Sequence, residues 1–178
     1  MSRNKLRRIF ISLGLAVVAL VMVVSVATAS SVRELRMEDK CDAATFPPEA
    51  GCTSNGDVTF QEFLAKLNPQ DKGHQAWKFS FGREHIDLNE TLRATNIGGE
   101  PHTFTKVQEF GGGCVATLNS PLGLTPVAEC SDPNIFPSTL VTSKNSLEIK
   151  GVNLGIGTHN FECLIHPWMR ITIEVRAD

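Results

Sequence analysis

The sequence contains no tyrosine, no internal repeat, no low-complexity tract and no Cys-x-x-Cys-His motif. Covalent attachment of a haem requires that motif, so such a haem is excluded. Basic residues are scarce beyond the N-terminal segment: residues 30–178 contain 13 Lys and Arg against 19 Asp and Glu, a net charge of −6. Surfaces that bind nucleic acid are basic, so this balance argues against nucleic acid as a partner.

The N-terminal segment has the layout of an export signal. Four basic residues precede an apolar run from Ile9 to about Val26, which closes on Ala27-Thr28-Ala29. The run is longer than the roughly 7–15 residues of a typical cleaved signal and near the lower limit for a membrane span. The Ala-x-Ala ending favours cleavage after Ala29, but a permanent anchor stays open. We expect residues 1–29 to be a signal peptide or membrane anchor and the rest to be periplasmic or extracellular.

The five cysteines leave one thiol unpaired. Exposed thiols tend to pair in an oxidising compartment. The simplest of the three possible pairings is local and joins Cys41 to Cys52 and Cys114 to Cys130. Cys163 is then left over, and an unpaired cysteine in an exported protein is buried and inert, reactive, or bound to a metal.

The first part of the exported chain shows one short helix. Residues 30–57 are polar, contain Pro47-Pro48 and lack sustained periodicity, which indicates a linker or loop. The spacing of Thr59 and Glu62 fits a capping box, and apolar residues follow on one helical face until Asn68-Pro69. This helix is expected to cover one end of a sheet.

Beyond the helix the apolar period changes to two. The alternation predicts strands in the segments 77–81, 86–94, 103–107, 147–149, 161–163 and 171–175. Between Val107 and Leu147 the pattern is interrupted by a long excursion that carries the expected Cys114–Cys130 bridge. The sequence therefore predicts an all-β domain over residues 58–178, an antiparallel β-sandwich with one short helix and a long disulfide-pinned insertion.

Metal-ligand side chains gather at one turn. Cys163, His166 and Met169 lie within seven residues, between two predicted strands, and His102 enters another strand after a turn rich in Gly and Pro. Two imidazoles, one thiolate and a weak axial thioether favour copper, because imidazole suits Cu(II) while the sulfur ligands suit Cu(I). Thr103 is a candidate backbone donor beside this site.

The Cys-x-x-His-Pro-x-Met-Arg run, with the Pro101-His102 turn and the flanking strands, resembles the cupredoxins over roughly residues 75–178, amicyanin more than plastocyanin. The interval from His102 to Cys163 is longer than in amicyanin. The resemblance implies a cupredoxin-like Greek-key sandwich that holds one copper ion at His102, Cys163, His166 and Met169. It implies an electron carrier, not an enzyme, cycling between Cu(II) and Cu(I).

The resemblance also implies where electrons leave. His166 would be the ligand nearest solvent, and redox proteins would dock beside its exposed edge. The apolar patch around that edge would include Pro101, Pro167 and Trp168.

Other interpretations of these residues are weaker or stay open. Cys163 and His166 could be the nucleophile and base of a cysteine hydrolase. Such an enzyme needs an orienting Asn or Asp and an oxyanion hole, and no sequence pattern indicates either. Zinc seldom takes methionine. A buried thiol and a core methionine would explain Cys163 or Met169 alone. An exported copper chaperone or storage protein stays open, although Met-rich and His-rich tracts are missing, and so does a copper-bearing subunit of a larger oxidoreductase.

Overall fold

The computed structural model describes residues 31–82 and 85–177, and the expected signal or anchor lies outside them. The strands are β1 (Val32–Glu38), β2 (Lys78–Phe81), β3 (His85–Asp87), β4 (Thr91–Asn96), β5 (His102–Thr103), β6 (Thr105–Val107), β7 (Leu140–Val141), β8 (Ser146–Lys150), β9 (Gly157–Glu162) and β10 (Arg170–Arg176). The helices are α1 (Phe60–Ala65), α2 (Ala116–Leu122), α3 (Ile135–Thr139) and α4 (Gly151–Leu154), with 3-10 turns at Pro48–Ala50 and Ala128–Ser131. Within the described ranges, no helix has the length and apolar character needed to cross a membrane.

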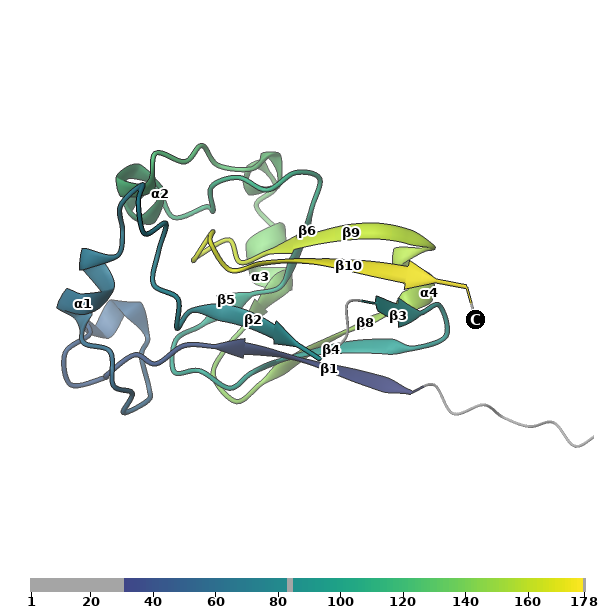
Figure 1. Cartoon of the computed structure of the whole chain (residues 1–178), viewed down its shortest axis with the longest axis horizontal. Helices are drawn as coiled ribbons and strands as arrows, with labels where there is room; N and C mark the ends of the chain where they lie inside the picture. Colours follow the sequence, from purple (N-terminus) through teal and green to yellow (C-terminus); the bar gives the residue numbers. More distant parts are fainter. Residues whose placement is uncertain (1–30, 83–84, 178) are drawn as a thin grey trace, which may run out of the picture.

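The predicted β-sandwich is confirmed, although it is not purely antiparallel. One sheet has the strand order β2-β1-β4-β8 and the other β3-β10-β9-β6, while β5 and β7 form a separate ribbon (Figure 1). β1 runs parallel to β4, and β10 runs parallel to β3. Side chains alternate across a strand whichever way its neighbour runs, so the apolar pattern could not separate the two cases.

The expected linker over residues 30–57 contains an inner strand of the sandwich instead. β1 pairs with both β2 and β4, and Leu35 and Met37 are fully buried. The charged residues at the alternate positions of this short strand masked its two core residues in the sequence. The sandwich therefore includes residues 32–38, which lie outside the predicted domain of residues 58–178.

The structure has more helix than the single predicted element. α1 has the expected capping box, in which Thr59 accepts a hydrogen bond from the backbone of Glu62. α2 and α3 lie in the predicted insertion between β6 and β7; the Cys114–Cys130 disulfide closes the part that contains α2, and α3 follows it. α2 and α3 have seven and five residues, about the length of α1, but neither has the side-chain N-cap that marks the start of α1, so no sequence signal indicated them.

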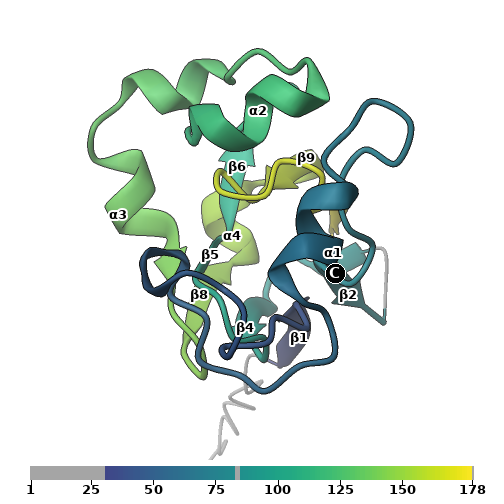
Figure 2. The ribbon, with the colours of Figure 1, turned by 90° about the vertical axis from the view of Figure 1, so that its left-hand side faces the viewer.

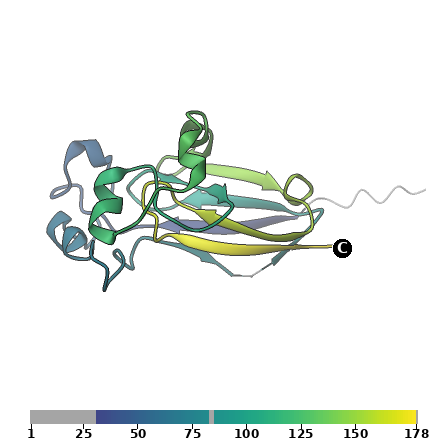
Figure 3. The ribbon, with the colours of Figure 1, turned by 90° about the horizontal axis from the view of Figure 1, so that it is seen from above.

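The helical segments lie mainly at one end of the sandwich. Seen from above, the strands run side by side away from that end, toward the C-terminus (Figure 3). The view onto the helical end shows the turn between β9 and β10 with α1, α2 and α3 around it (Figure 2). Phe104 and Phe161 stack inside the sandwich with ring centroids 4.3 Å apart. This stack places Cys163, two residues after Phe161, where the core meets the helical end.

Candidate metal centre

Three ligand atoms converge at the helical end of the sandwich. The Nδ1 atoms of His102 and His166 lie 3.2 Å apart, and each lies 3.9 Å from the Cys163 sulfur. His102 and Cys163 are fully buried and His166 is 2 % exposed. Among residues 31–82 and 85–177, these three form the one group of His, Cys, Asp or Glu side chains placed to hold a metal ion.

The triangle has the size that a first-row metal ion requires. Imidazole nitrogen and thiolate sulfur bind zinc, an ion of similar size to copper, at about 2.0–2.1 Å and about 2.3 Å. An ion at those distances fits among the three atoms. Two borderline nitrogens and one soft sulfur form a donor set that suits copper in both of its common oxidation states. The described residues therefore fit the ion that the resemblance implies.

The local chain path brings these atoms together. β9 ends at Glu162, one residue before Cys163, and β10 begins at Arg170. The turn between them is closed by two backbone bonds, since the Cys163 N–H donates to the Met169 carbonyl and the Met169 N–H donates to that of His166. Met169 is 1 % exposed within this turn, and its role as axial ligand stays a prediction.

Backbone donors surround the Cys163 sulfur. The N–H groups of Thr103 and His166 both donate to it at 3.4 Å, so the expected backbone bond from Thr103 is present. The Thr103 hydroxyl accepts from the Leu164 N–H at 2.7 Å and ties the two ligand-bearing segments together. Burial alone would raise the pKa of the Cys163 thiol, but the bonds and charges of His102 and His166 lower that pKa well below its usual range. The site thus favours a thiolate, the form that binds metals.

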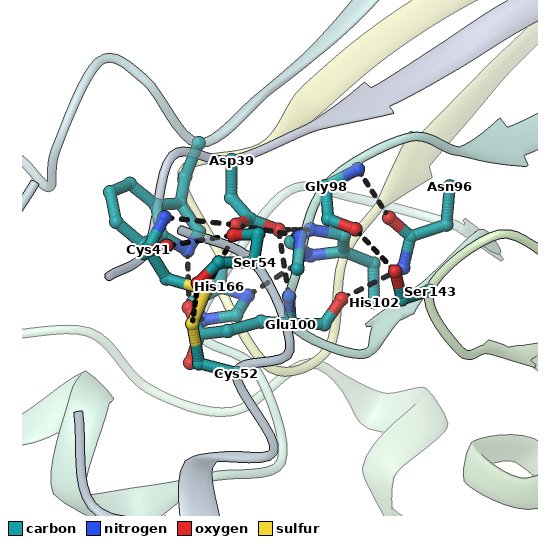
Figure 4. Close-up of polar contacts among 12 residues, drawn as sticks. Asp39, Cys41, Cys52, Ser54, Asn96, Gly98, Glu100, His102, Ser143 and His166 are labelled. Atoms are coloured by element: carbon teal, nitrogen blue, oxygen red, sulfur yellow. Dashed lines mark hydrogen bonds and ion pairs between the residues drawn. A yellow bond between two sulfur atoms is a disulfide. The ribbon is translucent and has the colours of Figure 1, made fainter. Parts of the chain in front are cut away.

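Buried carboxylates stand behind both imidazoles. Asp39 Oδ2 lies 2.9 Å from His102 Nε2, and both side chains are fully buried (Figure 4). Burial would lower the pKa of His102, but Asp39 and Cys163 raise that pKa to about 9. Glu100 Oε2 lies 3.6 Å from His166 Nε2, and burial raises the pKa of this carboxyl group. Sequence analysis missed both acids, and only Glu100, two residues before His102, lay close enough in the sequence to be noticed.

His166 is not the open edge that the resemblance implies. Its ring is 2 % exposed and lies against Phe63, Trp77 and Trp168, with ring centroids 6.1, 6.3 and 5.5 Å away. Phe63 belongs to α1, and α1 precedes the segment that resembles the cupredoxins. Phe63 therefore covers part of the ring from the N-terminal side of that segment.

The three residues expected to form an exposed apolar patch around His166 are buried or partly buried instead. Pro167 is buried, and Pro101 is partly buried beside the site. Trp168 is partly buried, and its Nε1 donates to the His74 carbonyl at 3.1 Å. Gly73 lies under this indole, since a Cβ there would meet the ring at 2.1 Å. Trp168 is therefore part of the packing that covers the site.

An apolar groove still reaches His166. It is open to solvent, has a volume of about 510 Å³ and runs between α1, the loop before it and the α2–α3 insertion. Glu49 and Glu100 are its two charged lining residues. Its apolar lining includes Phe46, Pro47, Ala50, Phe60, Phe63, Pro101, Leu118, Phe136, Leu140 and Ile165.

Comparison with known proteins gives structural neighbours only. No protein-family model and no curated protein matches the chain. A purple cupredoxin from Nitrosopumilus maritimus is 12% identical, with 81% of this chain and 99% of that one covered and a TM-score of 0.40. Oxidised plastocyanin from Dryopteris crassirhizoma is 16% identical, with 80% and 99% covered and a TM-score of 0.37. A reduced amicyanin variant is 16% identical, with 54% and 72% covered and a TM-score of 0.34.

Proposed function

We propose that this chain is a mononuclear type 1 copper protein that carries single electrons between redox partners and is not an enzyme. The observation that carries the proposal is the buried triangle formed by the Nδ1 atoms of His102 and His166 and the sulfur of Cys163. A thiolate with two imidazoles is the donor set of blue-copper electron-transfer sites. When bound, copper supplies a one-electron couple between Cu(II) and Cu(I).

The role of the protein is to hold the ligands in one arrangement. His102 is fixed by Asp39, and Cys163 accepts two backbone N–H bonds. We propose Met169, buried in the same turn, as the axial ligand. Ligands held rigidly in a packed core move little between two oxidation states, which favours fast electron exchange.

Burial of the ligands supports a carrier over a copper chaperone. Transfer of a metal ion to a partner protein needs ligands that the partner can reach. Here His102 and Cys163 are fully buried and His166 is 2 % exposed. An electron can cross a thin layer of side chains that an ion cannot cross without opening the site.

We propose that redox partners dock at the groove beside His166. The groove brings a partner close to this ligand, while Trp77 and Trp168 cover other parts of its ring. We further propose an exported location, periplasmic or extracellular, with possible membrane anchoring through the N-terminus. The disulfides Cys41–Cys52 and Cys114–Cys130 support an oxidising compartment.

The test is Cu(II) loading of the purified protein followed by visible absorption. The wild type is expected to give an intense thiolate-to-copper band, and Cys163→Ser is expected to lose it. His159→Gln is the matched control, because His159 is a histidine of β9 whose Nε2 contacts the Gly155 carbonyl and not the site. Wild-type protein that binds Cu(II) without the band, or a Cys163→Ser variant that keeps it, would refute the proposal.

A further inference from the structure

Four donors converge on the buried Asp39 carboxylate, just after β1 (Figure 4). Its Oδ1 accepts from the backbone N–H groups of Cys41 and Gly99 at 3.1 and 3.0 Å. Its Oδ2 accepts from the Glu100 N–H at 3.0 Å and lies 2.9 Å from His102 Nε2. Hydrogen bonds to a carboxylate favour its charged form.

The surrounding chain is shaped to fit this carboxylate. A Cβ at Gly98 would lie 2.0 Å from Asp39 Oδ2, so a side chain at that position would displace the acid. Asn96 holds the same turn in place, since its Oδ1 accepts from the Gly98 N–H at 2.9 Å and its Nδ2 donates to the Glu100 carbonyl at 2.8 Å. The Gly98-Gly99 pair therefore packs against an acid that lies 60 residues earlier in the chain.

The contact with Asp39 decides which nitrogen of His102 faces the other ligands. An ionised carboxylate only accepts hydrogen bonds, so the proton on Nε2 points at Asp39 and Nδ1 is the nitrogen left to bind a metal ion. His166 is held differently, because Glu100 lies 3.6 Å from its Nε2 and also accepts from the Trp77 Nε1 at 2.6 Å. The stronger carboxylate contact is thus on the His102 side.

We propose that Asp39 is a positioning residue that sets the reduction potential of the copper site. It orients His102, and its buried negative charge favours Cu(II) over Cu(I), which lowers the potential. The step from contact to potential is electrostatic: a fixed anion in a water-excluded site stabilises the more highly charged ion more. This inference rests on the proposed copper-binding function.

The experiment measures the affinities of wild type and Asp39→Asn for Cu(II) and Cu(I), together with the reduction potential. Asp39→Asn is expected to weaken Cu(II) binding at least tenfold more than Cu(I) binding, which corresponds to a potential at least 59 mV higher for a one-electron couple. Asp57→Asn is the matched control, because Asp57 pairs with Lys40 in a nearby loop with its side chain 72% exposed. The control is expected to keep the wild-type potential.

The outcomes distinguish a failure of the inference about Asp39 from a failure of the proposed copper-binding function. If the wild type shows the copper band and Asp39→Asn folds with an unchanged potential, Asp39 only holds the loop and this inference is wrong. If the wild type binds no copper, the proposed function itself fails and the inference fails with it. A loss of both affinities by the same factor also overturns the electrostatic role of Asp39.

A second measurement, made on the wild type, tests the proposal even if the Asp39→Asn variant does not fold. The Cu(I)-loaded wild type is diamagnetic, so its histidine rings can be observed by nitrogen and proton NMR. His102 is expected to carry its proton on Nε2, with a resonance shifted downfield by the bond to a carboxylate. Absence of a proton on His102 Nε2 would overturn the proposal without any variant.

Discussion

The Nδ1 atoms of His102 and His166 lie 3.2 Å apart, although 64 residues separate the two histidines in the chain. This distance accommodates one proton or one shared metal ion, but a proton on each nitrogen would force two donors against each other. Either one proton or one bound cation is therefore expected between the two nitrogens, and binding a metal ion displaces that proton.

Copper is expected to stabilise the folded chain. A ligand that binds only the native state adds about 2.7 kcal/mol at a free concentration 100 times its dissociation constant. For a chain of this size, 1 kcal/mol raises the unfolding midpoint by roughly 2–4 °C, so Cu(II) is expected to raise it by about 5–10 °C. Differential scanning calorimetry with and without Cu(II) measures the shift. Cys163→Ser should show a much smaller shift, and equal shifts in both proteins would contradict the site.

The metal-free protein is expected to gain stability from His102 at low pH. The pKa of His102 is raised to about 9 in the folded state, against about 6.5 in an unfolded chain. Its contribution is therefore fully present below about pH 6.5 and is lost as the pH rises through about 9.

Urea unfolding of metal-free wild type and His102→Gln at pH 6, 8 and 10 tests this pH dependence. The stability lead of the wild type is expected to shrink by up to about 3 kcal/mol between pH 6 and 10. A lead that stays constant over this range would show that His102 is not protonated in the folded state.

Phe63 is expected to control access to His166. Its ring packs on His166, Trp77 and Trp168, and it is 3 % exposed. Phe63→Ala is expected to destabilise the protein by about 3–5 kcal/mol. It should also open a path to the site, so that a chelator removes copper faster.

Leu64→Ala provides the control for this prediction, because Leu64 is the next residue of α1 and is 40% exposed. Stopped-flow loss of the copper band in excess chelator measures access, and urea unfolding measures stability. If both variants lose copper at the same rate, α1 does not act as the cover of His166.

Much of the fold and part of the site could be predicted from local patterns. The alternation around Leu92 and Ile173 predicted strands because one face of each strand is buried. The spacing from Cys163 to Met169 predicted a common turn because few residues separate the ligands. The local pairing of cysteines predicted both disulfides because short loops bring their ends together.

The rest depends on contacts between distant segments. Asp39 meets His102 only after β1 has paired with β4, and no periodicity within either segment indicates that pairing. The cover over His166 has the same origin, because Phe63 reaches the ring from a helix about 100 residues earlier in the chain. A pattern within one segment carries no information about which remote side chain will pack against it.

β1 separates the start of the sandwich from the metal centre. β1 begins at Val32 at the end of the sandwich away from α1 and ends next to Asp39, beside the ligands (Figure 1). Its seven residues, at about 3.3 Å each, separate the two ends by about 20 Å. If the chain were tethered to a surface through its N-terminus, the sandwich would act as a spacer. The groove beside His166 would then point outward, toward proteins arriving from solution.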